Sequence, residues 1–208
     1  GDANAAGVWP TLHGSVGALL TTFLVIPIVT KMSEHLGKKK TFMISQAISL
    51  LGYVLFWFLF IPGKPYAFLF ALPLFSFGIG GLFTLMMSMT ADTCDLDELN
   101  NGLPRKEATF GALYWWMVKF GFAIAGLLSG LIMQVIGFDA DVSAQSEEVL
   151  TGLRLSYILI PMTGTALAMW IMRDYDVSEQ RLAQIRSELA SHSPVGSRTS
   201  ASYGQAGA

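Results

Sequence analysis

The chain has 208 residues, of which 52% are hydrophobic and only 13% are charged, and its formal net charge is −2. Soluble domains carry about 25% charged residues, so this composition is typical of a membrane protein and argues against a soluble fold. The net charge gives no electrostatic basis for nucleic-acid binding, and the single cysteine, Cys94, excludes an internal disulfide.

Five stretches of the chain are long enough to cross a bilayer, whose hydrocarbon core needs about 20 apolar residues. They predict an all-α integral membrane protein with a transmembrane domain over residues 13–173. Its spans are expected at about 13–31, 41–61, 66–90, 109–137 and 154–173. Residues 1–12 are expected to be the extracytoplasmic start of a fragment. The alternative, a large soluble protein with buried helices, rarely shows so many uncharged runs.

Several small residues and prolines fall within these spans. Gly121-x-x-x-Ala125 and Gly126-x-x-x-Gly130 predict close helix packing on the fourth span. On the third span, flexibility is expected from Pro73, Gly78, Gly80 and Gly81. Pro27 and Pro161 predict kinks in their helices.

The segment after the last span is expected to leave the membrane. Residues 174–190 predict one cytoplasmic helix, which Asp176 and Glu179 start as a capping box. Its apolar face is formed by Leu182, Ile185 and Leu189. Residues 191–208 are rich in Ser, Gly and Ala and predict a disordered tail.

The basic residues fall mainly on one side of the five spans. That side holds Lys31, Lys38, Lys39, Lys40, Arg105, Lys106, Arg173, Arg181, Arg186 and Arg198, whereas the other holds only Lys64 and Arg154. Because short cytoplasmic loops are enriched in Lys and Arg, we expect an extracytoplasmic N-terminus and a cytoplasmic C-terminus. The expected location is the inner membrane of a bacterium.

Lys119 is the only charged residue between Ala108 and Phe138. If its helix starts near Thr109, Lys119 lies about 15 Å along it, close to the middle of the bilayer. A lysine there costs about 2.5 kcal/mol or more, so it needs a partner or a water-filled cavity. This predicts that a polar substance binds inside the protein or passes through it.

Three aromatic residues precede this lysine: Tyr114, Trp115 and Trp116. Trp115 and Trp116 lie four and three residues before Lys119, so they share its helix face best. A tryptophan ring can stack on the apolar face of a sugar, which makes these residues candidates for substrate binding. The alternative is that they pack against lipid or neighbouring helices.

Two cytoplasmic loops carry further candidates. Gly37, Lys38 and Lys39 form a tight basic turn, explained either as membrane flanking or as a loop signature of the major facilitator superfamily. The second loop carries charges of both signs, with gate candidates Asp92, Asp95, Glu98, Arg105 and Glu107. Salt bridges among them could close a cytoplasmic mouth; the alternative is a solvated loop whose exposed pairs contribute about 0–1 kcal/mol each.

The sequence around these charges resembles a known family. AD-x-x-D-x-D-E, G-x-x-R-K-E and K-x-G, together with the tail from VLTGLRLSY to QIRSEL, are similar to the glycoside–pentoside–hexuronide:cation symporters of the major facilitator superfamily. The resemblance covers the chain from about residue 14 to residue 190. It implies the C-terminal half of a twelve-helix transporter, with five helices corresponding to the eighth through twelfth.

This resemblance implies secondary active transport of a sugar or sugar acid, without a cofactor and coupled to Na⁺ or H⁺. Lys119 would lie near the sugar and cation sites, facing carboxylates of the missing N-terminal six-helix half. Trp115 replaces a residue that supplies a hydroxyl to the cation site in the family, which leaves H⁺ coupling or uncoupled transport open. The expected partners are the sugar, membrane lipid and the N-terminal half.

Two other functions remain as alternatives. One is a non-transporting membrane sensor or scaffold with the same fold. The other, a membrane enzyme, is disfavoured because the sequence has no cluster of catalytic residues, no metal-ligand spacing and no P-loop.

Overall fold

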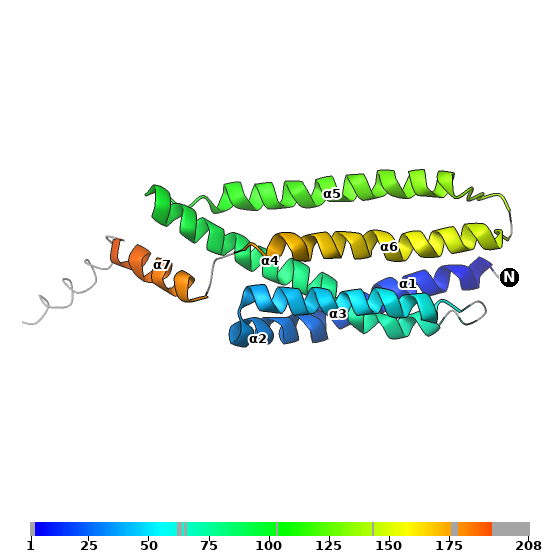
Figure 1. Cartoon of the computed structure of the whole chain (residues 1–208), viewed down its shortest axis with the longest axis horizontal. Coiled ribbons are helices and arrows are strands. Elements are labelled where there is room, and N and C mark those ends of the chain that lie inside the picture. Colours follow the sequence, from blue (N-terminus) through cyan, green and yellow to red (C-terminus); the bar gives the residue numbers. More distant parts are fainter. Residues whose placement is uncertain are drawn as a thin grey trace, which may run out of the picture. The chain divides into compact units, whose positions relative to one another are not determined.

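The computed structural model describes residues 3–61, 64, 66–102, 104–142, 144–175 and 179–192. Every regular element in these residues is helical (Figure 1). The elements are α1 (Ala3–Leu20), the π-helix η1 (Thr21–Val25), α2 (Ile26–Leu36), α3 (Lys38–Leu59), the 3-10 helix η2 (Ala67–Ala71), α4 (Leu72–Asn101), α5 (Glu107–Val135), α6 (Glu147–Met172) and α7 (Glu179–His192). Five helical stretches are long and apolar enough to cross a membrane: Gly14–Leu36, Lys38–Leu59, Leu69–Asn101, Glu107–Val135 and Glu147–Met172. This confirms the predicted all-α class with five candidate spans.

Several helices continue past the ends expected from the uncharged runs. α4 extends to Asn101, where Gly102 adopts a φ of 62° and donates its N–H to the Glu98 carbonyl at 2.9 Å. α6 begins at Glu147, because the Ser146 hydroxyl accepts the Val149 N–H at 3.3 Å. Charged residues limit the part of a helix that enters lipid, but they do not stop the helix itself.

The first candidate span is part of a longer helical run at the start of the chain. Residues from Ala3 onward form α1, which continues through η1 into α2. The Ile26 N–H bonds to the Thr21 carbonyl, the wider spacing of a π-helix, one residue before Pro27. Since a proline lacks the N–H of a regular helical turn, local rearrangement of this kind is expected beside it. The candidate span therefore reaches from Gly14 to Leu36.

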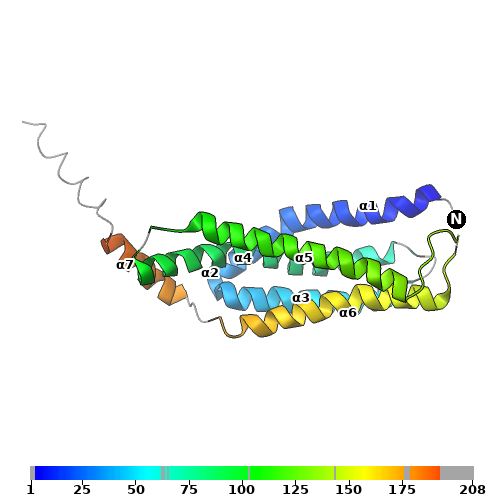
Figure 2. The same ribbon diagram turned by 90° about the horizontal axis from the view of Figure 1, so that it is seen from above.

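The chain divides into two compact units. The first unit comprises Gly1–Met86 and Met117–Tyr175, and the second comprises Met87–Trp116 and Asp176–Ala208. In the first unit, α3 packs against α2, η2 and α6, and α6 runs beside it (Figures 1 and 2). Phe56 on α3 is buried, with ring centroids 4.9 Å from Tyr157 and 5.6 Å from Phe75.

Small residues bring α3 and α4 close together in this unit. A Cβ placed on Gly78 would lie 2.6 Å from the Ser49 Cβ, and one on Gly81 would lie 2.6 Å from the Ser45 Cβ. The Gln46 side chain donates a buried hydrogen bond to the Gly78 carbonyl at 3.0 Å. The glycines of α4 thus serve helix packing, which differs from the expected bending.

Pro73 and the glycines of α5 also differ from the expectations drawn from the sequence. Pro73 is the second residue of α4, where a proline fits the first helical turn without kinking it. On α5, a Cβ added to Gly121, Gly126 or Gly130 would meet no described atom within 4 Å. No residue of α5 is buried by the part of the chain that the structure describes. The predicted close packing of α5 is therefore not found within these residues.

Candidate functional site

Two buried aspartates mark the charged end of α4. Asp92 is fully buried and Asp95 is 5% exposed. They are three residues apart on a continuous helix, so both side chains lie on one face. A buried carboxylate is costly unless charged or hydrogen-bonding groups compensate for the lost water, so the surroundings of these aspartates are informative.

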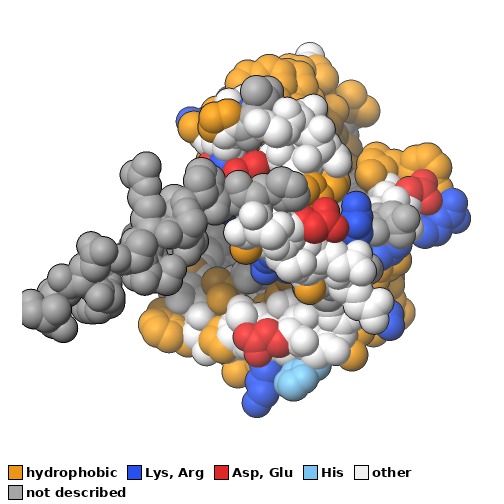
Figure 3. All heavy atoms as spheres, turned by 90° about the vertical axis from the view of Figure 1, so that its left-hand side faces the viewer, with side chains coloured by type: hydrophobic (Ala, Val, Ile, Leu, Met, Phe, Trp, Pro, Cys, Tyr) orange, Lys and Arg blue, Asp and Glu red, His pale blue; other side chains and the backbone are white. Residues whose placement is uncertain are grey.

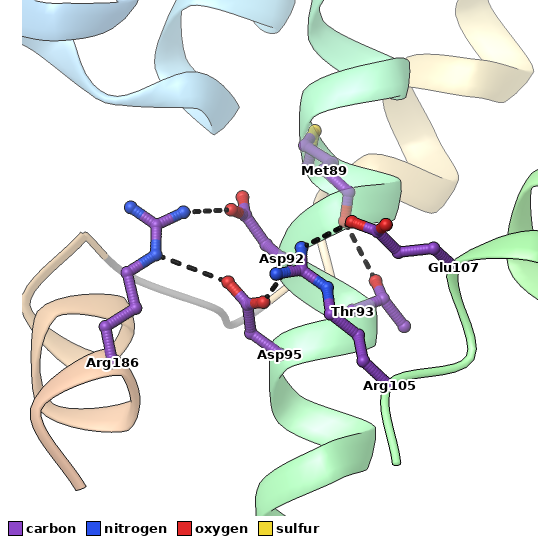
Figure 4. A network of polar contacts seen from close by, with 7 residues as sticks. All are labelled: Met89, Asp92, Thr93, Asp95, Arg105, Glu107 and Arg186. Carbon is purple, nitrogen blue, oxygen red and sulfur yellow. Dashed lines mark hydrogen bonds and ion pairs between the residues drawn. The ribbon is translucent and has the colours of Figure 1, made fainter. Parts of the chain in front are cut away.

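Two arginines from different elements provide that compensation (Figure 4). Arg186 of α7 lies with its Nη2 3.2 Å from Asp92 Oδ1 and its Nε 3.3 Å from Asp95 Oδ2. Arg105, just before α5, places its Nη2 3.1 Å from Asp95 Oδ1 and 2.9 Å from Glu107 Oε1. We call these five residues the ion-pair cluster. Asp95 contacts both arginines and so connects the two halves of the cluster.

The cluster is asymmetric in its exposure to solvent. The side chains of Asp92 and Asp95 are buried, whereas those of Arg105 and Arg186 are 41% and 60% exposed. The arginines can therefore move away at a modest cost in free energy, because water solvates a departing guanidinium. The aspartates gain no such solvation, because their buried carboxylates stay desolvated unless water enters. The arrangement suits a contact that opens only when water reaches α4.

A second ion pair lies beside the cluster. Lys106 Nζ is 3.0 Å from Asp97 Oδ2, and the Asn101 side chain donates to Asp97 Oδ1 at 2.7 Å. Among the described residues, Glu98 makes no ion pair, although it was expected in the gate. The face drawn in Figure 3 carries both acidic and basic side chains at its surface.

Sequence reasoning missed Arg186 as a member of the site. It entered only the count of basic residues, because nothing nearby in sequence connects it to α4. The useful signal was the apolar face of α7, where Leu182 is 2% exposed and Ile185 is fully buried. Arg186 lies four residues after Leu182, so it is on nearly the same side of α7 and close to whatever that buried face contacts. The expected capping box depends on Asp176 and the Glu179 side chain, which lie, like the tail from residue 193, outside what the structure describes.

Lys119 is exposed on α5, and no carboxylate of the described residues pairs with it. In the second unit, Trp115 and Trp116 are 47% and 59% exposed, while Tyr114 is half-buried. The Tyr114 ring lies 5.5 Å from that of Trp115, and its buried hydroxyl has no hydrogen-bond partner among the described residues. Tyr114 is therefore less exposed than the two tryptophans.

The basic turn after α2 has a clear structural role. Gly37 adopts a φ of 81°, a conformation that favours glycine, and separates α2 from α3. Lys39 donates from Nζ to the backbone carbonyls of Arg173 and Tyr175, both at 2.7 Å. A cation at the C-terminal end of a helix stabilises its free carbonyls. Lys39 thus places the start of α3 and the end of α6 at one level, while Lys38 begins α3.

Comparison with known proteins identifies the family of this chain. Residues 1–179 match the family described as MFS/sugar transport protein. A glucuronide carrier protein homolog of Escherichia coli (strain K12) is 31% identical over 177 residues, which cover 85% of this chain and 38% of the relative. A putative sulfoquinovose importer of Salmonella typhimurium is 29% identical over 191 residues, covering 88% of this chain and 38% of the relative. An isoprimeverose transporter of Lactiplantibacillus pentosus is 26% identical over 172 residues, covering 79% and 34%.

The chain spans less than two fifths of the length of these relatives. The relatives' names describe a carrier, an importer and a transporter, none of them an enzyme. The match confirms the resemblance drawn from the charged motifs around α4 and α5. The chain belongs to the MFS/sugar transport protein family, and it is an integral membrane protein.

Proposed function

We propose that this chain is part of a secondary active transporter that moves a sugar or sugar acid together with H⁺ or Na⁺. The names of the relatives, which refer to glucuronide, isoprimeverose and sulfoquinovose, support this substrate class. A six-helix N-terminal half would complete the substrate path, with binding near the middle of the membrane. The protein would lie in a bacterial inner membrane with its C-terminus in the cytoplasm.

The observation that carries this proposal is the ion-pair cluster at the end of α4. The positive-inside pattern assigns this end to the cytoplasm. With its pairs intact, the cluster closes the cytoplasmic mouth, because Arg105 and Arg186 hold segments from before α5 and from α7 against the buried aspartates. When the pairs separate, water must reach Asp92 and Asp95 to replace the guanidinium groups. Opening is therefore coupled to hydration of the pathway, as alternating access requires.

Lys119 is the proposed residue of the substrate and cation site. Its charge near mid-membrane would pair with carboxylates of the N-terminal half and respond to cation or proton binding. Trp115 and Trp116 would provide stacking surfaces for the sugar, and Tyr114 would support them. In the family, the residue at the position of Trp115 supplies a hydroxyl to the cation site. Because tryptophan has no hydroxyl, H⁺ is favoured over Na⁺ as the coupling ion.

Uptake by the complete protein in proteoliposomes tests the function. Labelled glucuronide, isoprimeverose and sulfoquinovose are each offered under an inward Na⁺ gradient, an inward H⁺ gradient and no gradient. We expect at least one sugar to be accumulated and one gradient to accelerate its entry. If the folded protein moves none of them under any gradient, the sensor or scaffold function replaces transport.

Arg105→Ala separates the gate from the binding site. Loss of its pair with Asp95 should change the maximal uptake rate about tenfold, which is 1.4 kcal/mol in the barrier. The concentration for half-maximal uptake should stay within about twofold, because the arginine does not contact sugar. Arg173→Gln is the matched control, since its pair with Asp174 is largely exposed on both sides. A change in apparent affinity alone would count against a gating role for Arg105.

A further inference from the structure

Arg154 is a charged residue of a membrane-crossing helix that the proposed transport mechanism does not use. It lies in the first unit, on the third turn of α6, and faces the end of α3. Its guanidinium carbon is 4.2 Å from the centre of the Trp57 ring and 5.6 Å from that of Phe60. Cations stack favourably on aromatic rings in this way.

The aromatic rings leave Arg154 incompletely satisfied. Its Nε is buried, and no described residue accepts a hydrogen bond from it. No carboxylate of the described residues forms an ion pair with it either. A buried charged donor without an acceptor is destabilising, so Arg154 can take an acceptor from outside the described residues, and its positive charge favours an anionic one.

The level of Arg154 in the membrane follows from two helices. On α6, Arg154 and Arg173 are separated by about 28 Å at 1.5 Å a residue, close to the thickness of the hydrocarbon core of about 30 Å. On α3, Lys40 and Phe60 are separated by about 30 Å by the same measure. Both distances start at one level, because Lys39 bonds to the carbonyl of Arg173. Arg154 and Phe60 therefore lie at the opposite edge of the hydrocarbon core.

Phospholipid phosphates lie just outside this edge. Helical side chains lean toward the N-terminus of their helix, which directs the Arg154 guanidinium away from the hydrocarbon. Guanidinium groups bind phosphate through paired hydrogen bonds, and tryptophan is enriched at this level of the membrane. Nearby side chains are exposed and apolar, which suits contact with acyl chains: Phe58 on α3, Ile61 just after α3 and Leu155 on α6. A carboxylate of a free sugar acid has similar charge but gains nothing from these apolar neighbours.

We propose that Arg154, stacked on Trp57 and Phe60, is a binding site for the phosphate of a membrane phospholipid. The site requires neither sugar transport nor a particular orientation of the protein in the membrane. It lies at the ends of α3 and α6 opposite Lys39, where the Trp57 and Phe60 rings hold the Arg154 guanidinium.

Native mass spectrometry of the complete protein in detergent tests the site. Phosphatidylglycerol is titrated into delipidated wild type, Arg154→Gln and Lys64→Gln. We expect Arg154→Gln to bind the tightest lipid at least about tenfold more weakly, through loss of charged hydrogen bonds. Lys64→Gln, which removes an exposed cation from the loop after α3, should bind within about twofold of wild type. Equal affinity of wild type and Arg154→Gln would overturn the proposal.

A second measurement needs no variant, so it holds even if Arg154→Gln does not fold. The melting temperature of the delipidated wild type is measured with phosphatidylglycerol and with diacylglycerol of the same acyl chains, which lacks the phosphate. Stabilisation by phosphatidylglycerol alone is expected. Equal stabilisation by both lipids would overturn the phosphate site, and displacement of the bound lipid by free glucuronate would assign Arg154 to a sugar acid instead.

Discussion

Asp92 and Arg186 differ sharply in their surroundings although they form one ion pair. The Asp92 side chain is fully buried, whereas that of Arg186 is 60% exposed, and the two groups are 3.2 Å apart. The carboxylate has lost its water and depends on compensating groups, while the guanidinium remains largely solvated. Removing the arginine should therefore cost more stability than breaking an exposed pair, and less than breaking a pair that is buried on both sides.

A double-mutant cycle measures this coupling. Arg186→Gln should lower the free energy of unfolding by about 1–2 kcal/mol, a value between those of exposed and buried pairs because the arginine is partly solvated. Asp92→Asn together with Arg186→Gln should cost less than the sum of the two single changes. Denaturation by SDS in mixed micelles gives the four free energies, and Arg173→Gln serves as an exposed control. Strictly additive costs would contradict a direct pair.

At the scale of helices, packing between α3 and α4 depends on residues without bulky side chains. Ser49 faces Gly78 and Ser45 faces Gly81, so the two backbones approach closely. In a membrane, where lipid competes for apolar side chains, such close contact is a main source of helix association. The buried bond from Gln46 to the Gly78 carbonyl adds a polar contact at the same crossing.

Gly78→Ala should disturb this crossing. The new methyl would lie 2.6 Å from the Ser49 Cβ, too close for both side chains without separation of the helices. Overpacking of this kind costs about 1–3 kcal/mol, which should lower the melting temperature in detergent. Gly164→Ala on α6 is the control, because its methyl meets no described atom within 4 Å. Adding Ser49→Gly to Gly78→Ala should recover most of the loss; no recovery would place the strain elsewhere.

The helices show which features could be predicted from the sequence and which could not. The five spans follow from the fixed thickness of the bilayer, so uncharged runs identify them. Helix ends cannot be identified in this way, because Asp92 and Asp95 interrupt the uncharged run while α4 continues to Asn101. The acidic and basic motifs around Arg105 were visible because they are near each other in sequence. The bond of Asp92 to Arg186 depends on α7, 94 residues further on, and no local pattern specifies it.

At the scale of the whole molecule, the charge distribution predicts one orientation in the membrane. On a Cys94→Ser background, Asp141→Cys should react with a membrane-impermeant maleimide on intact cells, because residue 141 is exposed in the loop before α6. Ala183→Cys, exposed on α7, should react only after permeabilisation. Labelling is read by a mass-tag shift on gels. The reverse pattern would show that the positive-inside count assigns the wrong sides.

Lys119 is the residue through which this chain is proposed to contact the N-terminal half. It lies about 18 Å along α5 from Glu107, on a helix that no described residue buries, so its partner is expected outside this chain. Because a lysine at mid-membrane costs about 2.5 kcal/mol, a lysine without a function would be a liability. Lys119→Gln in the complete protein should therefore reduce sugar uptake in proteoliposomes at least about tenfold, and it should lower the melting temperature, because the facing carboxylates lose their cation. Lys64→Gln, an exposed cation outside the helices, should leave both unchanged. Normal uptake by Lys119→Gln would remove this residue from the transport site, and a lower melting temperature with it would assign it to structure instead.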